Sequence, residues 1–312
     1  MAIEGGSSVV RCLYFPLNIL FTFPTFITAT FRSFSNLFTS FFFTRGEEVG
    51  TVSSLRVHPG RAMRETYQDS WFVGKDGFLL DKRLCLWEDT GKNGDRVNHK
   101  KTGSESLFHV RITLESIEKV VFSYQEMDDL KIAYNDIKGD LIFDDKNNEY
   151  LAVGEEADAW FSKVLSRTVK MVFVPYKNKS NKSNIPPSLD PVLIFAESSM
   201  ANFSDKAGWQ VEVERFRPNI MVKDCPEFAD ELWQEVKIGS DLVLEFSHRC
   251  TRCLIVNACD GEIKPDTFKT LLECRPREKG KPVLGSYFTV KKQGVVDVGD
   301  KIVVLKKRTA EA

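Results

Sequence analysis

The chain has 312 residues, of which 43 are basic and 44 acidic, and its formal net charge at pH 7 is −1. This length is sufficient for two domains with a sizeable core. The balanced charge, and the lack of any basic stretch with interleaved aromatic residues, exclude a nucleic-acid partner. Seven cysteines are an odd and modest number for this length, so the sequence favours a reducing compartment over a disulfide-stapled secreted fold.

The N-terminal segment, residues 1–48, is predicted to be a hydrophobic anchor and linker. Residues 12–31 read CLYFPLNILFTFPTFITATF without a charge, which is about the length of a helix that crosses a bilayer. A cleaved signal peptide and a buried hydrophobic hairpin are the alternatives, but the start of the chain carries Glu4 and lacks a basic region. Arg32 and Arg45 follow the span, which predicts a body that faces the cytosol.

The body begins near residue 49, and its first part, residues 49–170, is predicted to be an α+β region. Short apolar or alternating runs broken by Gly, Asp and Asn are typical of strands. They lie at 52–59, 106–114, 119–125, 130–135 and 140–145. Residues 155–168 combine helical spacing with acids in the first turn, which predicts a helix, and 169–176 return to a strand.

The second part, residues 171–312, is predicted to be a β-barrel domain. It opens with the polar, proline-ended loop 177–188, which we interpret as a domain junction or flap. Many short strands with Gly-Asp and Gly-Ser turns indicate a closed or nearly closed barrel. The expected strands lie at 191–200, 209–222, 232–246, 253–259 and 295–305, with a helix at 265–275.

The stretch SHRCTRCLIV, residues 247–256, places two cysteines three residues apart. With Cys259 and Cys274, Cys250 and Cys253 could form a structural zinc site, although this spacing fits no common zinc module. A redox pair would need a helix after the cysteines rather than an apolar strand. Two inert buried cysteines remain an alternative, since free cysteine is often part of a core. The GxSxG, Walker A, GxGxxG and HExxH signatures are absent from the sequence.

A series of motifs in a fixed order resembles the MOSC domain. The series runs RFRPNIMV (215–222), FADELWQEVKIG (228–239), CTRC (250–253), GSYFTV (285–290) and VGDKIVVL (298–305). The chain is most similar in this respect to the mitochondrial amidoxime-reducing component family of molybdenum enzymes. The resemblance is strong over 190–306 and weaker over 50–165. It implies an N-terminal MOSC-associated α/β region followed by a MOSC β-barrel, behind a membrane anchor.

The resemblance also implies a site. Cys253, the second cysteine of C-x-R-C, takes the position of the catalytic molybdenum ligand, with Cys250 as its non-ligand companion. A soft thiolate suits such a metal, and the other ligands would come from the molybdenum cofactor, Mo-molybdopterin. Arg217 falls where a planar guanidinium would hold the pterin phosphate. Further positions expected to contact the cofactor are Asn219, Thr251, Arg252 and Tyr287.

Three positions depart from the family pattern. The Pro-x-Lys-Ser of the family is Pro59-Gly60-Arg61-Ala62 here, which keeps a cation at Arg61 but loses a hydroxyl donor. The Asp-Arg pair is Asp81-Lys82, so a point charge at Lys82 replaces a bidentate fork. Leu189-Asp190 replaces Thr-Ser before a proline, and we expect Asp190 to face the substrate as a catalytic residue rather than the phosphate.

Three functions are compatible with this resemblance. The first is a membrane-anchored molybdenum oxidoreductase that reduces N-hydroxylated compounds with electrons from cytochrome b5 and NADH-cytochrome b5 reductase. The anchor would place it in the mitochondrial outer membrane or, alternatively, in the endoplasmic reticulum membrane. The second function is a carrier of the molybdenum cofactor or of sulfur, and the third is a non-catalytic scaffold whose weakened phosphate contacts leave the cofactor unbound.

The predicted orientation has a direct test, because N-x-S sequons occur at Asn178, Asn181 and Asn202. Sequons that reach the secretory lumen accept glycans. We expect the full-length chain, expressed in a eukaryotic cell, to show no change of mass after glycosidase treatment. The control is the same body behind a cleavable signal peptide, which should be glycosylated. A glycosidase-sensitive shift in the native chain would contradict the cytosolic orientation.

Overall fold

The computed structural model describes the body of the protein, namely residues 46–61, 63–88, 95–96, 105–143, 148–176, 192–259, 262–263 and 266–308. The predicted anchor at 12–31, the loop 177–188 and the position Asp190 lie outside the described residues. Within these ranges no helix has both the length and the apolar composition required to traverse a bilayer.

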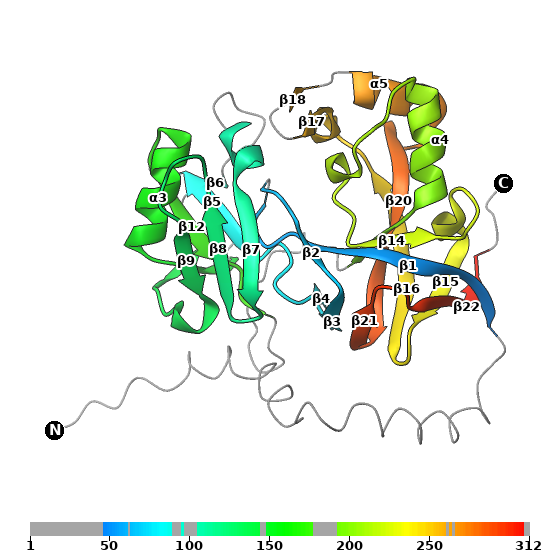
Figure 1. Cartoon of the computed structure of the whole chain (residues 1–312), viewed down its shortest axis with the longest axis horizontal. Coiled ribbons are helices and arrows are strands. Elements are labelled where there is room, and N and C mark those ends of the chain that lie inside the picture. The colour runs from blue at the N-terminus through cyan, green and yellow to red at the C-terminus, as the bar shows by residue number, and fades with distance from the viewer. Residues whose placement is uncertain are drawn as a thin grey trace.

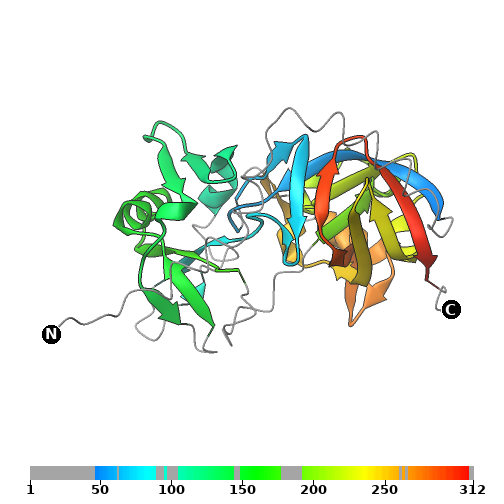
Figure 2. The ribbon, with the colours of Figure 1, turned by 90° about the horizontal axis from the view of Figure 1, so that it is seen from below.

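The N-terminal unit is built mainly from antiparallel strands, and it forms the lobe with α3 in Figures 1 and 2. One sheet has the order β10-β11-β12-β5-β6 and a second has the order β7-β8-β9. The strands of both sheets pair antiparallel, which agrees with the α+β class predicted for residues 49–170. The strands are β5 (Leu84–Glu88), β6 (Asp95–Arg96), β7 (Arg111–Ser116), β8 (Lys119–Ser123), β9 (Leu130–Ala133), β10 (Leu141–Phe143), β11 (Glu149–Ala152) and β12 (Val169–Phe173).

The helix predicted at 155–168 is confirmed as α3 (Glu155–Leu165), the α-helix of this lobe among the residues described. Glu155, Glu156 and Asp158 in its first turn complement the positive end of the helix dipole. Its buried face packs on the sheet, where Phe161 meets Phe122 edge to face at 5.3 Å between ring centroids. The helix thus covers the apolar face of the small sheet. Short 3-10 helices flank the sheet at η3 (Glu105–His109) and η4 (Tyr134–Asp136).

The predicted β-barrel is confirmed. Its sheet has the order β13-β14-β1-β22-β15-β16-β20-β19, and β13 also pairs with β20, which closes a ring of strands. The strands are β1 (Glu47–Val57), β13 (Val192–Ala196), β14 (Ile220–Lys223), β15 (Trp233–Ile238), β16 (Leu242–Thr251), β19 (Arg277–Glu278), β20 (Lys281–Lys292) and β22 (Lys301–Lys307).

The first strand of the body belongs to this barrel. β1 runs between β14 and β22, and Figure 1 shows it beginning in the barrel and running toward the middle of the molecule. A second connection is the small sheet in which β21 of the barrel half pairs with β3. The N-terminal part of the chain therefore completes the C-terminal fold. The remaining strands here are β2 (Thr66–Gln68), β3 (Ser70–Gly74), β4 (Gly77–Phe78) and β21 (Gly294–Asp297).

The sequence-based assignment fails in three segments of the barrel half. The expected strand 191–200 is β13 followed by the helix α4 (Glu197–Ala207). The expected strand 209–222 has a 3-10 turn, η5 (Val213–Arg215), before β14. The expected strand 253–259 is the 3-10 helix η7 (Leu254–Asn257) followed by β17 (Ala258–Cys259). In each case short apolar runs have no clear period, so tertiary contacts decide the conformation.

α4 and α5 (Asp266–Cys274) cover one side of the barrel wall, where Figure 1 places them side by side. α5 confirms the helix predicted at 265–275. A separate core lies beneath the two helices, and it contains Phe195, Phe203, Phe216, Cys250 and Leu271. The remaining short elements are η6 (Ala229–Leu232) and β18 (Glu262–Ile263).

Gly285 is the point at which β20 bends over this core. Its φ of +80° lies in the left-handed region that favours glycine, and a Cβ built there would lie 1.5 Å from Cε1 of Phe195. Both the backbone conformation and the ring therefore require the absence of a side chain. The register between β16 and β20 is irregular between Arg249 and Thr251, opposite this bend.

We predict that Gly285→Ala destabilises the protein by roughly 3 kcal/mol, the sum of a backbone cost and an overpacking cost. Gly280→Ala is the matched control, because Gly280 has nearly the same φ, +76°, with no atom within 4 Å of its Cβ position. This variant should lose only about 1 kcal/mol. Urea unfolding measures the free energy of unfolding of both variants. An equal loss of stability in the two would show that the ring of Phe195 moves away from the added methyl group at no cost.

Candidate functional site

Three loops that are far apart in sequence meet beside the start of β14. The backbone N–H of Lys82 donates to the carbonyl of His58 at 2.7 Å, and the N–H of His58 donates to the Asp81 carboxylate at 2.8 Å. Nε2 of His58 contacts the carbonyl oxygen of Pro218 at 3.1 Å. His58 therefore joins the loop after β1, the turn before β5 and the segment before β14. Each loop carries one of the predicted phosphate-binding cations: Arg61, Lys82 and Arg217.

Arg217 carries a positive charge that its hydrogen bonds do not neutralise. The residue has a left-handed φ of +55°, and its guanidinium donates to the carbonyls of Met63 and Gly60. Both acceptors are neutral, so they orient the guanidinium without cancelling its charge. Burial lowers the pKa of Arg217, and the nearby Arg61 acts in the same direction. An anion at this position would stabilise the guanidinium through charge-assisted hydrogen bonds.

Two carboxylates oppose the cations. Glu65 and Asp81 both raise the pKa of Arg217, although burial outweighs them. Burial raises the pKa of Asp81, but Lys82 and His58 together lower it below its ordinary value. The Lys82 ammonium lies 3.0 Å from Oδ2 of Asp81. The charge at Lys82 is therefore already paired within the protein, which weakens its predicted role as a phosphate contact.

The neighbouring Arg83 does not take the place of the missing arginine fork. Its side chain is buried and points away from the three loops, with a hydrogen bond from NH1 to the Pro175 carbonyl at 3.0 Å. Its guanidinium stacks over the ring of Tyr176 at 4.0 Å. Arg83 thus belongs to the core between β5 and β12.

Asn219 is fully buried and ties three strands together. Its side-chain oxygen accepts from the N–H of Leu193 at 3.0 Å, and its amide nitrogen donates to the carbonyl of Arg56 at 3.3 Å. The backbone N–H of Asn219 donates to the carbonyl of Leu193, and the backbone carbonyl of Asn219 accepts from the N–H of Arg56, at 2.8 Å each. Asn219 therefore fixes β13 and β1 on either side of β14 and positions the Arg217 loop. A direct contact with a cofactor stays a prediction.

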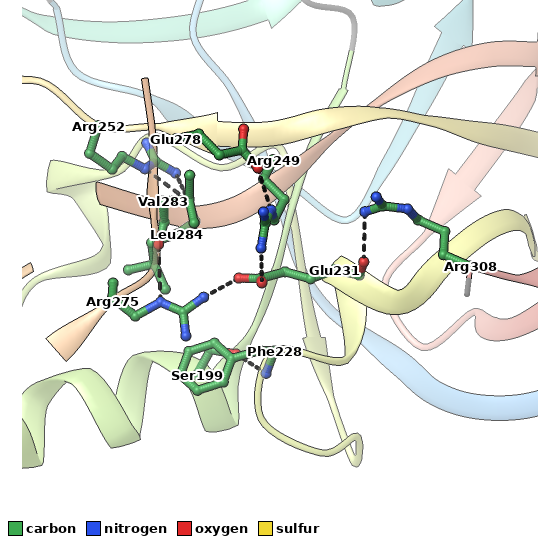
Figure 3. Close-up of polar contacts among 10 residues, drawn as sticks. All are labelled: Ser199, Phe228, Glu231, Arg249, Arg252, Arg275, Glu278, Val283, Leu284 and Arg308. Atoms are coloured by element: carbon green, nitrogen blue, oxygen red, sulfur yellow. Dashed lines mark hydrogen bonds and ion pairs between the residues drawn. The ribbon is translucent and has the colours of Figure 1, made fainter. Parts of the chain in front are cut away.

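Arg252 joins the two sequence motifs on which the site depends. Its side chain is buried, and Nε and NH2 both donate to the carbonyl of Leu284, at 2.8 and 2.6 Å, as Figure 3 shows. NH1 donates to the carbonyl of Phe216 at 3.0 Å. The arginine of C-x-R-C is thus bonded to the residue before Arg217. Thr251, the last residue of β16, is exposed next to it.

A second group of charged side chains, drawn in Figure 3, contacts β16 and β20. Glu231 accepts from Arg275 and lies 3.7 Å from Arg249 of β16, and Arg249 also pairs with Glu278. Nε of Arg275 donates to the carbonyl of Val283 at 3.0 Å. Arg252 and Arg275 therefore bond to adjacent carbonyls of β20. β20 is thus held by Arg252 and Arg275, and β16, which leads into Cys253, is held through the ion pairs of Arg249.

The structure separates the two cysteines of C-x-R-C. Cys250 is 4% exposed and packs in the core beneath α4 and α5. Cys253 is partly exposed and immediately precedes η7. NH1 of Arg215 donates to the carbonyl of Asn257 at 2.8 Å, which ties η7 to the segment that carries Arg217. The segment that carries Cys253 and the segment that carries Arg217 are therefore hydrogen-bonded to each other at two points. One bond joins Arg252 to Phe216, and the other joins Arg215 to Asn257.

Tyr287 lies on β20 between Leu193 of β13 and His248 of β16. Its ring is 5.1 Å from that of His248, and its phenol is close enough to raise the pKa of Arg217. Tyr287 thus lies on the same side of the barrel as Arg217. Asp190, by contrast, falls outside the described residues.

The alternative of a zinc site gains no geometric support. In the part of the chain that the structure describes, no three His, Cys, Asp or Glu side chains are grouped to hold a metal ion. The described cysteines, which include Cys259 and Cys274, form no disulfide with one another. The segment after the pair is the short 3-10 helix η7 rather than the strand expected from the sequence.

Comparison with family models defines the class of the protein. Residues 49–168 match the MOSC N-terminal beta barrel domain and residues 187–303 match the MOSC domain. The chain therefore belongs to the MOSC-domain proteins, with both domains in the order that the motifs predicted. The description of the first domain as a β-barrel agrees with its antiparallel strands.

Among curated proteins the chain is similar to mitochondrial amidoxime-reducing component 1 of Danio rerio. The two are 28% identical over 285 residues, which cover 81% of this chain and 84% of the relative. It is also 28% identical over 291 residues to mitochondrial amidoxime reducing component 2 of Bos taurus, covering 83% and 84%. Among solved structures, YuaD of Bacillus subtilis aligns with a TM-score of 0.38 at 10% identity over 82% of this chain and 94% of that one.

Sequence reasoning missed several residues that shape the site. The motifs of the sequence do not include His58, although its place before Pro59-Gly60-Arg61 is a signal that it borders a functional loop. Glu65 had no signal, because its proximity to Arg217 arises only in the folded barrel. Arg215 stands inside RFRPN and was given no role, yet it is buried and donates to the backbone carbonyls of Val256 and Asn257.

The acidic motif before β15 contains a buried carboxylic acid. Asp230 is 1% exposed, and within the described structure its Oδ2 has no hydrogen-bond donor. Burial raises the pKa of Asp230 to about 7, and Glu231 acts in the same direction. The folded protein therefore binds this proton more tightly than the unfolded chain between about pH 4 and 7. In this window the contribution of Asp230 to stability falls as pH rises.

We predict that Asp230→Asn is more stable than the natural protein above pH 7, by up to about 4 kcal/mol, and similar to it near pH 4. The variant keeps the size of the side chain but cannot become a buried anion. Urea unfolding at a series of pH values gives the difference in free energy. A constant difference across the range would show that Asp230 does not titrate in the folded state.

Proposed function

We propose that this MOSC protein is a membrane-anchored, molybdenum-cofactor-dependent oxidoreductase that reduces N-hydroxylated substrates. The observation that carries the proposal is the joining of two motifs: Arg252 of C-x-R-C donates to the carbonyl of Phe216, next to Arg217. A candidate metal thiolate, Cys253, and a candidate phosphate-binding cation thereby belong to one hydrogen-bonded unit. The names of the similar proteins, which describe amidoxime reduction, support the reaction type.

The residues present fit the cofactor in two respects. The partly buried guanidinium of Arg217 donates to two neutral carbonyls, and the carboxylates of Glu65 and Asp81 are nearby, so a phosphate would add a charge-assisted hydrogen-bond partner. The thiol of Cys253 is partly exposed, and a soft thiolate is a suitable ligand for molybdenum. Arg61 and Tyr287 would border the group, because both act on the pKa of Arg217.

The cofactor, when bound, would supply the redox chemistry, while the protein supplies orientation and electrostatics. Converting an N–OH group to N–H releases water and consumes two electrons and two protons, and we assign the electrons to cytochrome b5 and NADH-cytochrome b5 reductase. Arg217 would anchor the phosphate, Cys253 would ligate the metal, and Arg252 would hold their segments at a fixed separation. Asp190 would face the substrate.

A carrier of the cofactor or of sulfur is the second candidate. One observation favours weaker retention: the ammonium of Lys82 is paired with Asp81 and is not an uncompensated cation. A carrier must release its cargo, so a weaker phosphate contact would suit it. A non-catalytic scaffold would result if the phosphate contacts were too weak to hold the cofactor at all.

The proposed location is the outer membrane of mitochondria, with residues 12–31 as the anchor and the body in the cytosol. The similar proteins are named as mitochondrial components, which supports mitochondrial association. The endoplasmic reticulum membrane is the alternative. A cytosolic body would give the proposed electron donors access to the site and would keep the thiol of Cys253 reduced.

We predict that Cys253→Ala removes the protein sulfur from the molybdenum centre and abolishes amidoxime reduction. Cys250→Ala is the matched control and should largely spare both, because Cys250 packs in the core. X-ray absorption of the purified protein reports the number of sulfur ligands, elemental analysis reports molybdenum content, and turnover of a model amidoxime reports activity. Equal loss from both substitutions, accompanied by stoichiometric zinc, would replace this assignment with a four-cysteine zinc site.

A further inference from the structure

His58 is a fully enclosed polar side chain beside the cation cluster. It is 0% exposed, and hydrogen bonds join it to Asp81, Lys82 and Pro218. Burial is the largest cause that lowers its pKa, the charges of Arg217 and Lys82 lower it further, and that of Asp81 raises it. His58 itself belongs to the loop after β1. It contacts the turn before β5 through its backbone and the segment before β14 through its ring.

The contacts of the ring fix its protonation. A carbonyl oxygen can only accept, so Nε2 must carry the hydrogen that is shared with the Pro218 carbonyl at 3.1 Å. Burial lowers the pKa of His58 well below its ordinary value, and Arg217 adds to this, so the imidazole is neutral at physiological pH. Nδ1 is then a bare acceptor, and it has no donor among the residues that the structure describes.

A neutral imidazole is electrostatically more favourable than an imidazolium beside the cations of this site. An imidazolium would add a further positive charge beside Arg217 and Lys82, whereas a neutral Nε2–H tautomer donates to Pro218 without changing the charge of the cluster. Pro218 has no backbone N–H and follows directly on Arg217, whose left-handed φ is already unusual for a residue with a side chain. The bond from His58 is thus a restraint on the backbone that sets the direction of Arg217.

We propose that His58 is a positioning residue of the anion site: its neutral Nε2–H tautomer holds the Pro218 carbonyl and thereby aims the guanidinium of Arg217 at a phosphate group. The proposal rests on the proposed function, in which Arg217 binds that phosphate. It assigns a role to a residue that lies outside the motifs of the family resemblance.

The tautomer is measured first, on the unmodified protein. Long-range ¹⁵N correlation spectra of the full-length chain in detergent, produced in a host that cannot make molybdopterin, should show His58 with a protonated Nε2 and a bare Nδ1 at pH 7. An imidazolium or an Nδ1–H tautomer would overturn the proposal. This measurement requires no substitution and so does not depend on the folding of a variant.

The second measurement is the affinity of the same cofactor-free chain for inorganic phosphate, obtained by calorimetry. His58→Leu removes the donor and should weaken phosphate binding at least about tenfold, the effect of one lost hydrogen bond to an oriented group. His58→Gln can still donate to the Pro218 carbonyl and should retain affinity within about threefold. His109→Gln is the control for loss of a histidine elsewhere, since His109 is exposed at the end of η3.

Rescue by glutamine separates positioning from general destabilisation. Wild-type affinity in His58→Leu, or an equal loss in His58→Leu and His58→Gln, would overturn the inference. Arg217→Ala tests the proposed function separately, and it should abolish phosphate binding. Unchanged phosphate binding by Arg217→Ala would refute the phosphate site itself, whereas a loss there together with normal binding by His58→Leu would refute only the role of His58.

Discussion

The guanidinium of Arg252 is the interaction on which the arrangement of the candidate site depends. It is buried, and it donates to the carbonyls of Leu284 and Phe216, which belong to segments that meet only because the barrel is closed. A planar fork can satisfy two carbonyls that lie in different directions, which a lysine ammonium on a flexible stem would do with less geometric definition. The residue after Arg252 is the candidate metal ligand Cys253, and the residue after Phe216 is the candidate phosphate ligand Arg217. One buried side chain therefore sets the separation between the two functional groups.

The positive charges around Arg217 are partly offset by neighbouring carboxylates, so the site is weakly cationic. Arg61 and Arg217 contribute positive charge, Lys82 is paired with Asp81, and the charge of Glu65 opposes that of Arg217. A partly buried guanidinium whose hydrogen bonds go to neutral carbonyls is less well solvated than an exposed one, and the surrounding segments hold it in place. This is the pattern expected of a group that is completed by a ligand rather than by the protein. Under the proposed function, Arg217 would carry the main share of phosphate binding in a chain that lacks the arginine fork and the hydroxyl of the family.

The two MOSC domains are structurally interdependent. β1, at the start of the N-terminal domain, is a strand of the C-terminal barrel, and β3 pairs with β21. The loop after β1, which carries His58 and Arg61, therefore lies beside the start of β14, next to Arg217. The site thus draws on both halves of the chain, and the core cluster that contains Val52, Phe161 and Val236 runs through both. Separate expression of either half would divide the barrel as well as the site.

The sequence by itself determined the barrel class, the helices at α3 and α5, and the positions of Cys253 and Arg217, because motif order and strong periodicity are local properties of the chain. It did not determine α4, η5 or η7, since apolar runs as short as these have no decisive period and follow the contacts available to them. It also did not determine that Asn219 and Arg252 bond to backbone carbonyls, that Lys82 is paired with Asp81, or that His58 joins three loops. Those roles depend on how the folded chain places side chains and backbone carbonyls, from the adjacent Asp81 and Lys82 to His58 and Pro218, which are 160 positions apart in sequence. Such distances are set by the tertiary structure and not by the local sequence.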